Sequence, residues 1–534
     1  MTISISVASG VDALFSLLPL SAQEFKLASE MAIVLCLIVL NLRGLKESIV
    51  FLLPIFIGFV ITHISLILYG VLFHIDRLPS LIPDTLSETQ NLGNEMGWAF
   101  VVSTMLFAYS QGGGTYTGLE AVSNNVNTLA EPRVRTGKWT MLYIATSLAF
   151  TAGGIILLYL LWDVKPVAGQ TLNAVTFKEI LGDRQLFGLD MGHFSLVIVL
   201  ILEAGLLFVA SNTGFLGGPA VLANMAVDQW VPHQFSHLSG RLVTKNGILL
   251  MGAGALGILL LTQGKVAFLA VLYSINVFIT FTLSLLGMCI YWWRHRKTKD
   301  GWLWHFITSF TGLVVTSSIL ITLLVEKFTE GGWVTTVITG VVIGICLLIK
   351  NHYTEIKKQL KEVDALFSTL KAAKADFPPK LDPHKATAVF MVAKNRGTGM
   401  HTLLSVERLF RGHFKNYVFL SVGEVDSKSY GGDKSLEQMQ KKVDSLLDFY
   451  INFCNENGLA ATSYHAYGID PVEELTTMAE TVKKNYPNCV FFSSKLIFQN
   501  DNWFTNMLHN KTAFALQRRL HLRGIPMLIL PMKL

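Results

Sequence analysis

Charged residues are scarce in this sequence, and hydrophobic residues are abundant. Asp, Glu, Lys and Arg make up only 15% of the 534 residues, whereas 51% are hydrophobic. This balance excludes an ordinary globular protein and predicts a chain that crosses a membrane several times. No stretch combines basic and aromatic residues as a single-strand binder would, so a nucleic-acid partner is not expected.

Cysteines are few, and none is spaced as a metal ligand or redox pair. The five lie at Cys36, Cys289, Cys346, Cys454 and Cys489, without CxxC or Cys/His spacing. We interpret them as small buried hydrophobic residues rather than disulfide partners or ligands. No nucleophile–base pair is recognisable, so neither an enzyme nor a resident cofactor is expected, and no metal site beyond a transported cation.

Long apolar runs dominate the first 350 residues. They lie near residues 3–20, 30–42, 49–73, 98–126, 139–162, 193–227, 246–263, 266–292, 303–325 and 332–349. All but the first are predicted to span the bilayer. Basic loops, such as Arg43–Lys46 and Arg133–Lys138, alternate with an acidic loop at 76–95 and with others that lack a basic cluster. The positive-inside rule therefore predicts a multi-pass protein of the cell membrane with a cytoplasmic C-terminus.

A glycine-broken segment is the main candidate for a transport site. Gly113 and Gly114 interrupt the apolar run 98–126 and leave backbone groups free, while Thr117 and Glu120 are three residues apart on one helix face. Carboxylate, hydroxyl and carbonyl oxygens suit Na⁺, K⁺ or H⁺. The alternative is that Glu120 only forms a hydrogen bond to a neighbouring helix, although acids inside a membrane generally serve function.

Two further acids occur in apolar segments. Glu203 has no glycine break or neighbouring hydroxyl in the sequence, so a structural role and a proton-relay role remain equal alternatives. Asp12 is expected at the surface, near the end of its helix. The small residues from Asn212 to Gly218 predict close helix packing.

The pattern changes after residue 350. Residues 351–383 predict a polar linker helix that ends at prolines, and 384–534 predict a soluble domain. Short β-type runs alternate there with helical patterns, at 386–393, 417–425, 460–467, 489–498 and 526–531. This alternation predicts a parallel sheet with helices on both faces. Gly397–Gly399, after the first strand, could cradle an anion, but such a short loop is more often a turn.

Several ordered motifs resemble the amino acid–polyamine–organocation (APC) superfamily. They are Thr115–Asn124, Glu131–Arg133 and Ser211–Asp228, and the similarity covers residues 1–350. Within the superfamily the sequence is similar to the KimA-type potassium–proton symporters. The resemblance implies a LeuT-type fold of twelve helices in two inverted five-helix repeats, with the glycine-broken segment as the sixth helix.

The resemblance also implies roles for individual residues. Thr117 and Glu120 match residues of the family's potassium pathway, and Thr2 and Ser6 match a Thr and a Ser four apart on the family's third helix. Only about three segments precede the broken helix, where the fold has five. We therefore expect an N-terminally truncated chain, with the first two helices missing, an incomplete repeat and no transport by the chain as written.

The C-terminal domain resembles the universal stress proteins. Residues 493–500 contain no glycine where the nucleotide-binding members have a glycine-rich loop, so ATP binding is not expected. The KimA-type family implies inhibition by cyclic di-AMP and dimerisation through this cytoplasmic domain. Arg241, in a loop predicted to face the cytoplasm, is the candidate contact from the membrane region.

These observations together predict a secondary active importer of potassium that is driven by protons and regulated through its C-terminal domain. An amino acid or polyamine permease is the first alternative, although Glu120 argues against a zwitterionic substrate because it repels a carboxylate. A membrane sensor without transport, which signals through the soluble domain, is the second.

Overall fold

The structure is a computed structural model, and it describes most of the chain. The described residues are 1–44, 48–112, 122, 126, 129–182, 185–186, 189–241, 243–368, 379–393, 395–425, 433–497, 508–509 and 511–533. The chain divides into two compact units. The first contains Met1–Pro219 and Ile248–Val342, and the second contains Ala220–Gly247 and Ile343–Leu534.

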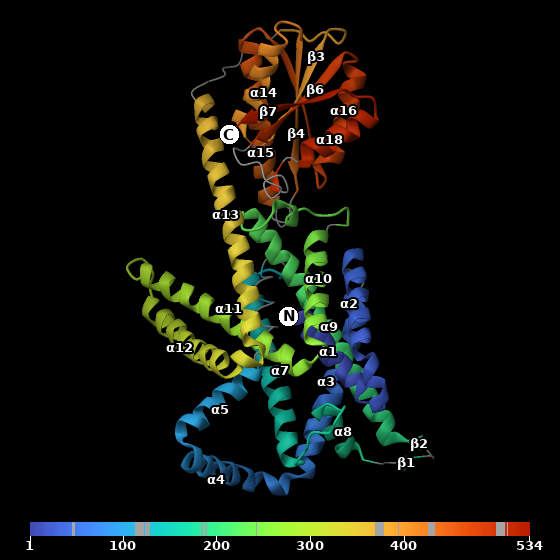
Figure 1. Ribbon diagram of the computed structural model, residues 1–534, viewed down its shortest axis with the longest axis vertical. Helices are drawn as coiled ribbons and strands as arrows, with labels where there is room; N and C mark the ends of the chain where they lie inside the picture. Colours follow the sequence, from blue (N-terminus) through green and yellow to red (C-terminus); the bar gives the residue numbers. More distant parts are fainter. Residues whose placement is uncertain are drawn as a thin grey trace. The chain divides into compact units, whose positions relative to one another are not determined.

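Helices form nearly all of the membrane region (Figure 1). They are α1 (Thr2–Phe15), α2 (Lys26–Arg43), α3 (Ser48–Phe73), α4 (Leu78–Met96), α5 (Trp98–Gln111), α7 (Arg133–Leu161), α8 (Leu172–Leu181), α9 (Met191–Val227), α10 (Lys245–Thr262), α11 (Val266–Arg294), α12 (Trp302–Lys327) and α13 (Trp333–Ser368). Short elements connect them: η1 (Leu20–Phe25), η2 (Ile75–Arg77), η5 (His233–Phe235), η6 (Phe328–Gly332), β1 (Gln185–Leu186) and β2 (Leu189–Asp190).

Eight helices in the described part are long and apolar enough to cross a bilayer, which confirms eight of the nine predicted spans. The ninth, 98–126, is described as helix only over α5, and residues 113–121 lie outside the described residues. Large apolar side chains on these helices point outward, with Leu261 72%, Trp304 70% and Val325 75% exposed. In water such surfaces would be unfavourable, so they are the lipid-facing surfaces of a multi-pass membrane protein.

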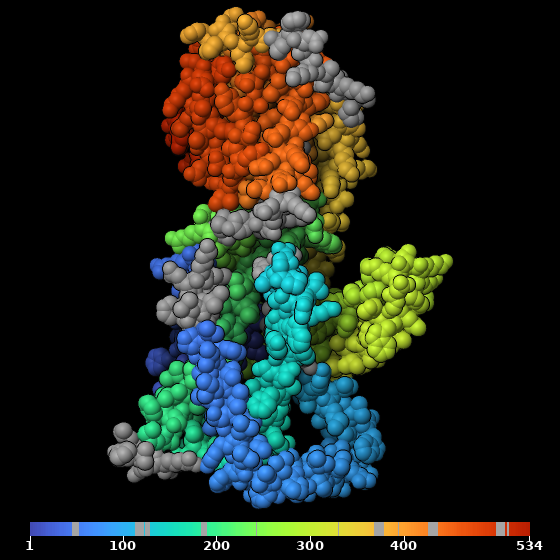
Figure 2. All heavy atoms as spheres, turned by 180° about the vertical axis from the view of Figure 1, so that it is seen from behind, coloured from blue at the N-terminus to red at the C-terminus, as the bar shows by residue number. Residues whose placement is uncertain are grey.

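Small residues let neighbouring helices approach closely. A Cβ at Gly154 of α7 would lie 2.7 Å from Ile67 Cγ2 of α3. Figure 2 shows these two helices as adjacent columns, in cyan and blue. Cβ atoms at Gly214 and Gly218 of α9 would lie 2.6 Å from Ile3 Cγ1 and Met251 Sδ, which confirms the predicted close packing of this segment.

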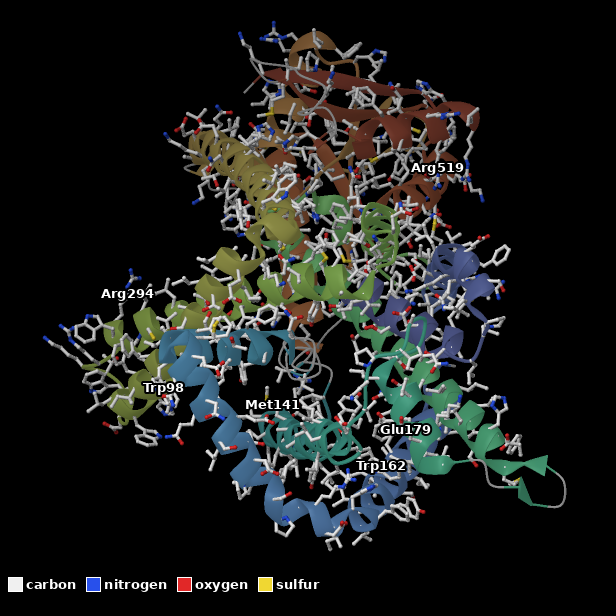
Figure 3. The ribbon with its side chains drawn as sticks, turned by 60° about the horizontal axis from the view of Figure 1, so that its bottom comes forward. Trp98, Met141, Trp162, Glu179, Arg294 and Arg519 are labelled. Carbon is white, nitrogen blue, oxygen red and sulfur yellow. The ribbon has the colours of Figure 1, made fainter. Side chains whose placement is uncertain are left out.

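Helices α11 and α12 pack along each other as a hairpin, with Arg294 at its far end (Figure 3). The acidic segment 76–95, predicted as a loop, is instead mainly helix α4. Pro79 occupies its first turn, where a missing N–H costs nothing, and Gly97 with φ +90° ends it. The loop prediction was wrong because polar composition alone does not separate an exposed helix from a loop.

A five-stranded parallel sheet forms the centre of the C-terminal region. The strands are β3 (Thr387–Met391), β4 (Asn416–Glu424), β5 (Ala460–Gly468), β6 (Cys489–Ile497) and β7 (Met527–Lys533), in the order β5-β4-β3-β6-β7. Helices α14 (Arg396–Leu409) and α15 (Asp433–Glu456) pack on one face, and α16 (Pro471–Asn485) and α18 (Lys511–Leu522) pack on the other. The predicted α/β architecture is confirmed.

Strand residues alternate between the two cores. Phe390 lies in the core under α14 and α15, whereas its neighbour Val389 lies in the core under α16 and α18. At the start of α14, the Gly397 N–H donates to Asp364 Oδ1 of α13 at 2.7 Å. A carboxylate of the chain itself therefore occupies this helix N-terminus, which favours the structural interpretation of Gly397–Gly399 over an anion site.

The cysteines are all free, and the expectation that they are buried holds for three of them. Cys289, Cys454 and Cys489 are buried, Cys346 is half-buried, and Cys36 is exposed on α2. Cys36 differs because its helix presents apolar side chains outward as well as inward, as a membrane helix can. Apolar surroundings in the sequence therefore did not distinguish burial in protein from exposure on a membrane helix.

Candidate functional site

The residues of the glycine-broken segment are not in the described part of the chain. Gly113, Gly114, Thr117 and Glu120 all lie outside the described residues, so their roles stay predictions. Arg241 is described and exposed.

The predicted pair on α1 lies in a well-packed helix. Thr2 and Ser6 are half-buried and one turn apart, so their side chains share a face. Between them, buried Ser4 donates to the carbonyl of Ala255 on α10 at 3.1 Å. The bond joins α1 to α10 between the positions of Thr2 and Ser6.

Glu203 belongs to a polar network inside the membrane unit. The Asn173 amide on α8 donates to Glu203 Oε1 on α9 at 2.6 Å, and the Tyr159 hydroxyl on α7 donates to Asn173 Oδ1. Asn173 is positioned by the start of α8, where the Thr171 side chain caps the helix by accepting from Ala174 N at 3.2 Å. Three helices thus contribute one group each.

The second carboxylate oxygen of Glu203 lacks a hydrogen-bond partner among the described residues. This oxygen, Oε2, is buried. A buried acceptor without a partner is costly unless a proton, ion or water occupies it. The sequence shows no hydroxyl beside Glu203, and only the fold brings Asn173 and Tyr159 to it.

A second buried carboxylate, Glu30 on α2, was not singled out from the sequence. Its side chain is fully buried, and neither oxygen has a hydrogen-bond partner among the residues that the structure describes. The carboxylate lies directly against Gly264, where φ of +65° already favours glycine. An acid one turn after Lys26, at the start of an apolar run, was the signal that could have revealed it.

Asp12 lies in the same part of the membrane unit and forms an ion pair with Lys26. Its side chain is 26% exposed. It is therefore a paired, partly buried acid rather than the free surface acid that its place in the sequence suggested.

A cavity of about 420 Å³ opens at the carboxyl ends of strands β3, β4 and β6, within the second unit. In open parallel sheets ligands bind at this edge, close to where the strand order reverses. Its polar lining residues are His233, Asn395, Thr398, Glu424, Ser493, Ser494 and Thr512. The described lining includes no Lys or Arg, and Glu424 carries negative charge, so the cavity favours a cation over an anion.

Apolar spans, carboxylates in the helical unit with oxygens unpartnered among the described residues, and an α/β domain define a polytopic membrane protein with a C-terminal α/β module. Residues 2–351 match the family model for amino acid permeases, and the chain belongs to that family. The chain is also similar to the potassium transporter KimA of Bacillus subtilis (strain 168), with 30% identity over 365 residues. The match covers 68% of this chain and spans only 57% of that relative.

Proposed function

We propose that this permease is a proton-coupled potassium importer. The observation that carries the proposal is the 30% identity to a protein described as a potassium transporter. Thr117 and Glu120, with Thr2 and Ser6, would supply oxygen ligands along the potassium pathway, and Gly113 and Gly114 would free backbone carbonyls. A hard cation without a hydration shell requires such oxygen ligands.

Potassium uptake by cells that express the protein tests this proposal. In a host strain that lacks its own potassium uptake, we expect growth at low potassium and loss of growth with Glu120→Gln. Glu88→Gln on exposed helix α4 is the matched control and should behave as the unchanged protein. Normal uptake with Glu120→Gln would refute the assigned role of this acid.

Glu203 is the described residue best placed to carry the coupled proton. Its side chain is half-buried, with one hydrogen-bonded oxygen and one buried oxygen that has no partner in the described part of the unit. Asn173→Ala removes a hydrogen bond to a charged group, worth about 1.5–3 kcal/mol. We therefore expect the proton concentration that gives half-maximal uptake to change by roughly 10-fold or more. Unchanged proton dependence in both Asn173→Ala and Glu203→Gln would exclude this role.

An amino acid or polyamine permease is the second candidate, because the matching family is named for amino acid transport. The acid Glu120 would favour a cationic substrate over a zwitterion. Labelled potassium uptake in the presence of excess amino acids or polyamines separates the two functions. Competition, together with uptake of the labelled competitor, would favour the permease.

We further propose that the membrane unit has the LeuT-type inverted repeat and that the α/β domain is a cytoplasmic module like the universal stress proteins. The alternation of parallel strands and helices, with helices on both faces of the sheet, is compatible with such a module. Strand β7 is at one edge of the sheet with Leu528 44% exposed, and it offers a surface through which a homodimer could form. Cross-linking of cysteines placed along β7 would test this.

Cyclic di-AMP is the proposed regulator. A phosphodiester ring requires cations, and the described lining of the cavity at the sheet edge contains neither Lys nor Arg. We therefore assign the proposed contact to exposed Arg241 rather than to that cavity. Calorimetry of the full chain with cyclic di-AMP should show binding that Arg241→Ala weakens. The absence of heat with the unchanged protein would rule out this regulator.

A further inference from the structure

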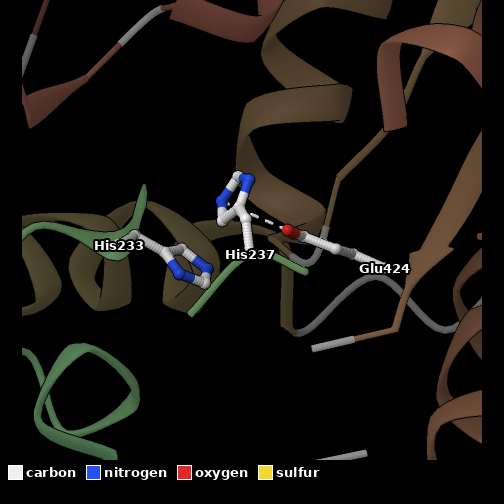
Figure 4. Close-up of side chains that lie close together, drawn as sticks. All are labelled: His233, His237 and Glu424. Carbon is white, nitrogen blue, oxygen red and sulfur yellow. Dashed lines mark ion pairs between the residues drawn. The ribbon is translucent and has the colours of Figure 1, made fainter. Parts of the chain in front are cut away.

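Two histidines and a glutamate converge at the edge of the sheet cavity, within the second unit. His233 begins the 3₁₀ turn η5, His237 follows one residue after its C-cap, and Glu424 is the last residue of β4. The centroids of the two imidazole rings lie 5.3 Å apart, and His237 Nε2 lies 3.2 Å from Glu424 Oε1 (Figure 4). The three potential ligand atoms all lie within 4.8 Å of one another.

The turn fixes which nitrogen of His233 is available. Ser236 Oγ donates to the His233 carbonyl at 2.7 Å, so the same oxygen accepts from His233 Nδ1–H at 2.6 Å. Nε2 of His233 then carries a free lone pair. Metal-binding histidines typically have this arrangement, in which one ring nitrogen is held by a second group and the other binds the ion.

Burial and charge also favour a cation at this place. The Glu424 side chain is only 16% exposed, and its Oε1 faces His237 without a hydrogen bond of good geometry. No Lys or Arg is among the described residues that line the adjoining cavity. A carboxylate beside two imidazoles attracts a positive ion, and the exposed position of His233 leaves a path for its entry.

We propose that His233, His237 and Glu424 bind a divalent transition-metal ion such as Zn²⁺. Two imidazole nitrogens and one carboxylate oxygen form a borderline ligand set, which suits this class of ion and not K⁺, Mg²⁺ or Ca²⁺. Tetrahedral ligands at about 2.0–2.1 Å from Zn²⁺ are about 3.4 Å apart. Movements of the side-chain ligand atoms by about 1 Å would bring them to this spacing. Three protein ligands leave the fourth tetrahedral position open.

Such an ion would connect two parts of the second unit. His233 and His237 belong to the chain between α9 and α10, whereas Glu424 ends a central strand of the α/β domain. In the described structure this connection includes the 3.2 Å contact of His237 with Glu424 and contacts of α13, such as Lys350 Nζ donating to the Asp228 carbonyl at 2.6 Å. The metal site is independent of the potassium pathway and was not expected from the sequence.

Zinc binding by the full chain in detergent, stripped with a chelator, tests the proposal. We expect one equivalent of Zn²⁺ in competition with a chromophoric indicator. His233→Ala and His237→Ala should each weaken binding by at least about 100-fold, and Ser236→Ala by about 10-fold, because it only orients a ligand. His352→Ala is the matched control, because His352 and His509 form another imidazole pair, with Nε2 atoms 3.2 Å apart.

The same measurements distinguish a metal site from a direct contact of His237 with Glu424 without metal. No bound Zn²⁺, binding that survives in the His233→Ala/His237→Ala double variant, or loss of binding with His352→Ala alone would each overturn it. If a variant does not fold, the visible spectrum of Co²⁺ bound to the unchanged chain decides. Intense tetrahedral bands with imidazole ligands support the site, and the weak bands of hydrated Co²⁺ overturn it.

Discussion

The packing of Gly399 against Tyr450 gives a prediction with a defined sign and size. Gly399 lies in the second turn of α14, where alanine would normally stabilise a helix by about 1 kcal/mol over glycine. Here a Cβ would overlap Tyr450 Oη and lie 2.7 Å from Tyr450 Cζ. Tyr450 is fully buried, and its hydroxyl donates to the Arg396 carbonyl at 2.8 Å. Gly399→Ala must therefore displace this ring.

The magnitude follows from two losses. Overpacking a core costs about 1–3 kcal/mol, and losing the hydroxyl hydrogen bond costs about 1 kcal/mol, so the two losses together are about 2–4 kcal/mol. The gain of about 1 kcal/mol in helix propensity offsets part of them and leaves a net loss of about 1–3 kcal/mol. At about 2–4 °C per kcal/mol, the unfolding temperature of the α/β domain should fall by about 2–12 °C. The measurement is thermal unfolding of the full chain in detergent, with amide hydrogen exchange of the sheet to identify the domain that unfolds.

Tyr450→Phe supplies the control. It removes the oxygen that the new methyl group would overlap, so the cost of Gly399→Ala should be smaller by about 1 kcal/mol or more in the Tyr450→Phe background. Strict additivity of the two changes would show that the overlap is relieved elsewhere. Stabilisation by Gly399→Ala alone would refute the packing argument and leave helix propensity as the dominant effect.

Two further predictions concern titrating groups of the C-terminal region. Burial, with a contribution from neighbouring His352, lowers the pKa of His509 to about 4. The unfolded chain takes up this proton below about pH 6.5, whereas the folded chain takes it up only near pH 4. The free energy of unfolding should therefore fall as the pH drops from about 6.5 to 4, by no more than about 2 kcal/mol after solvent screening. His509→Gln should remove this slope from the pH profile of the unfolding temperature, and parallel profiles would contradict it. Burial also raises the pKa of Cys454 to about 12, so its thiol should resist alkylation at pH 8 until the domain unfolds, as mass spectrometry would show.

Periodic and compositional features were readable from the sequence. The apolar runs specified eight described spans because a bilayer requires long uncharged segments. The five parallel strands and their flanking helices were likewise visible, since Phe390 and its neighbours belong to a nearly continuous apolar run typical of strands buried on both faces. Helix α4 was missed because an exposed polar helix and a loop have similar compositions.

Contacts between distant residues depended on the fold. Glu203 meets Asn173 and Tyr159 only because α7, α8 and α9 come together. The His233–His237 spacing was present in the sequence, yet the third group, Glu424, is almost two hundred residues away along the chain. Local sequence sets helix, strand and span because these depend on neighbours along the chain. A binding site depends on which side chains the tertiary structure brings within a few ångströms, and that is decided by packing.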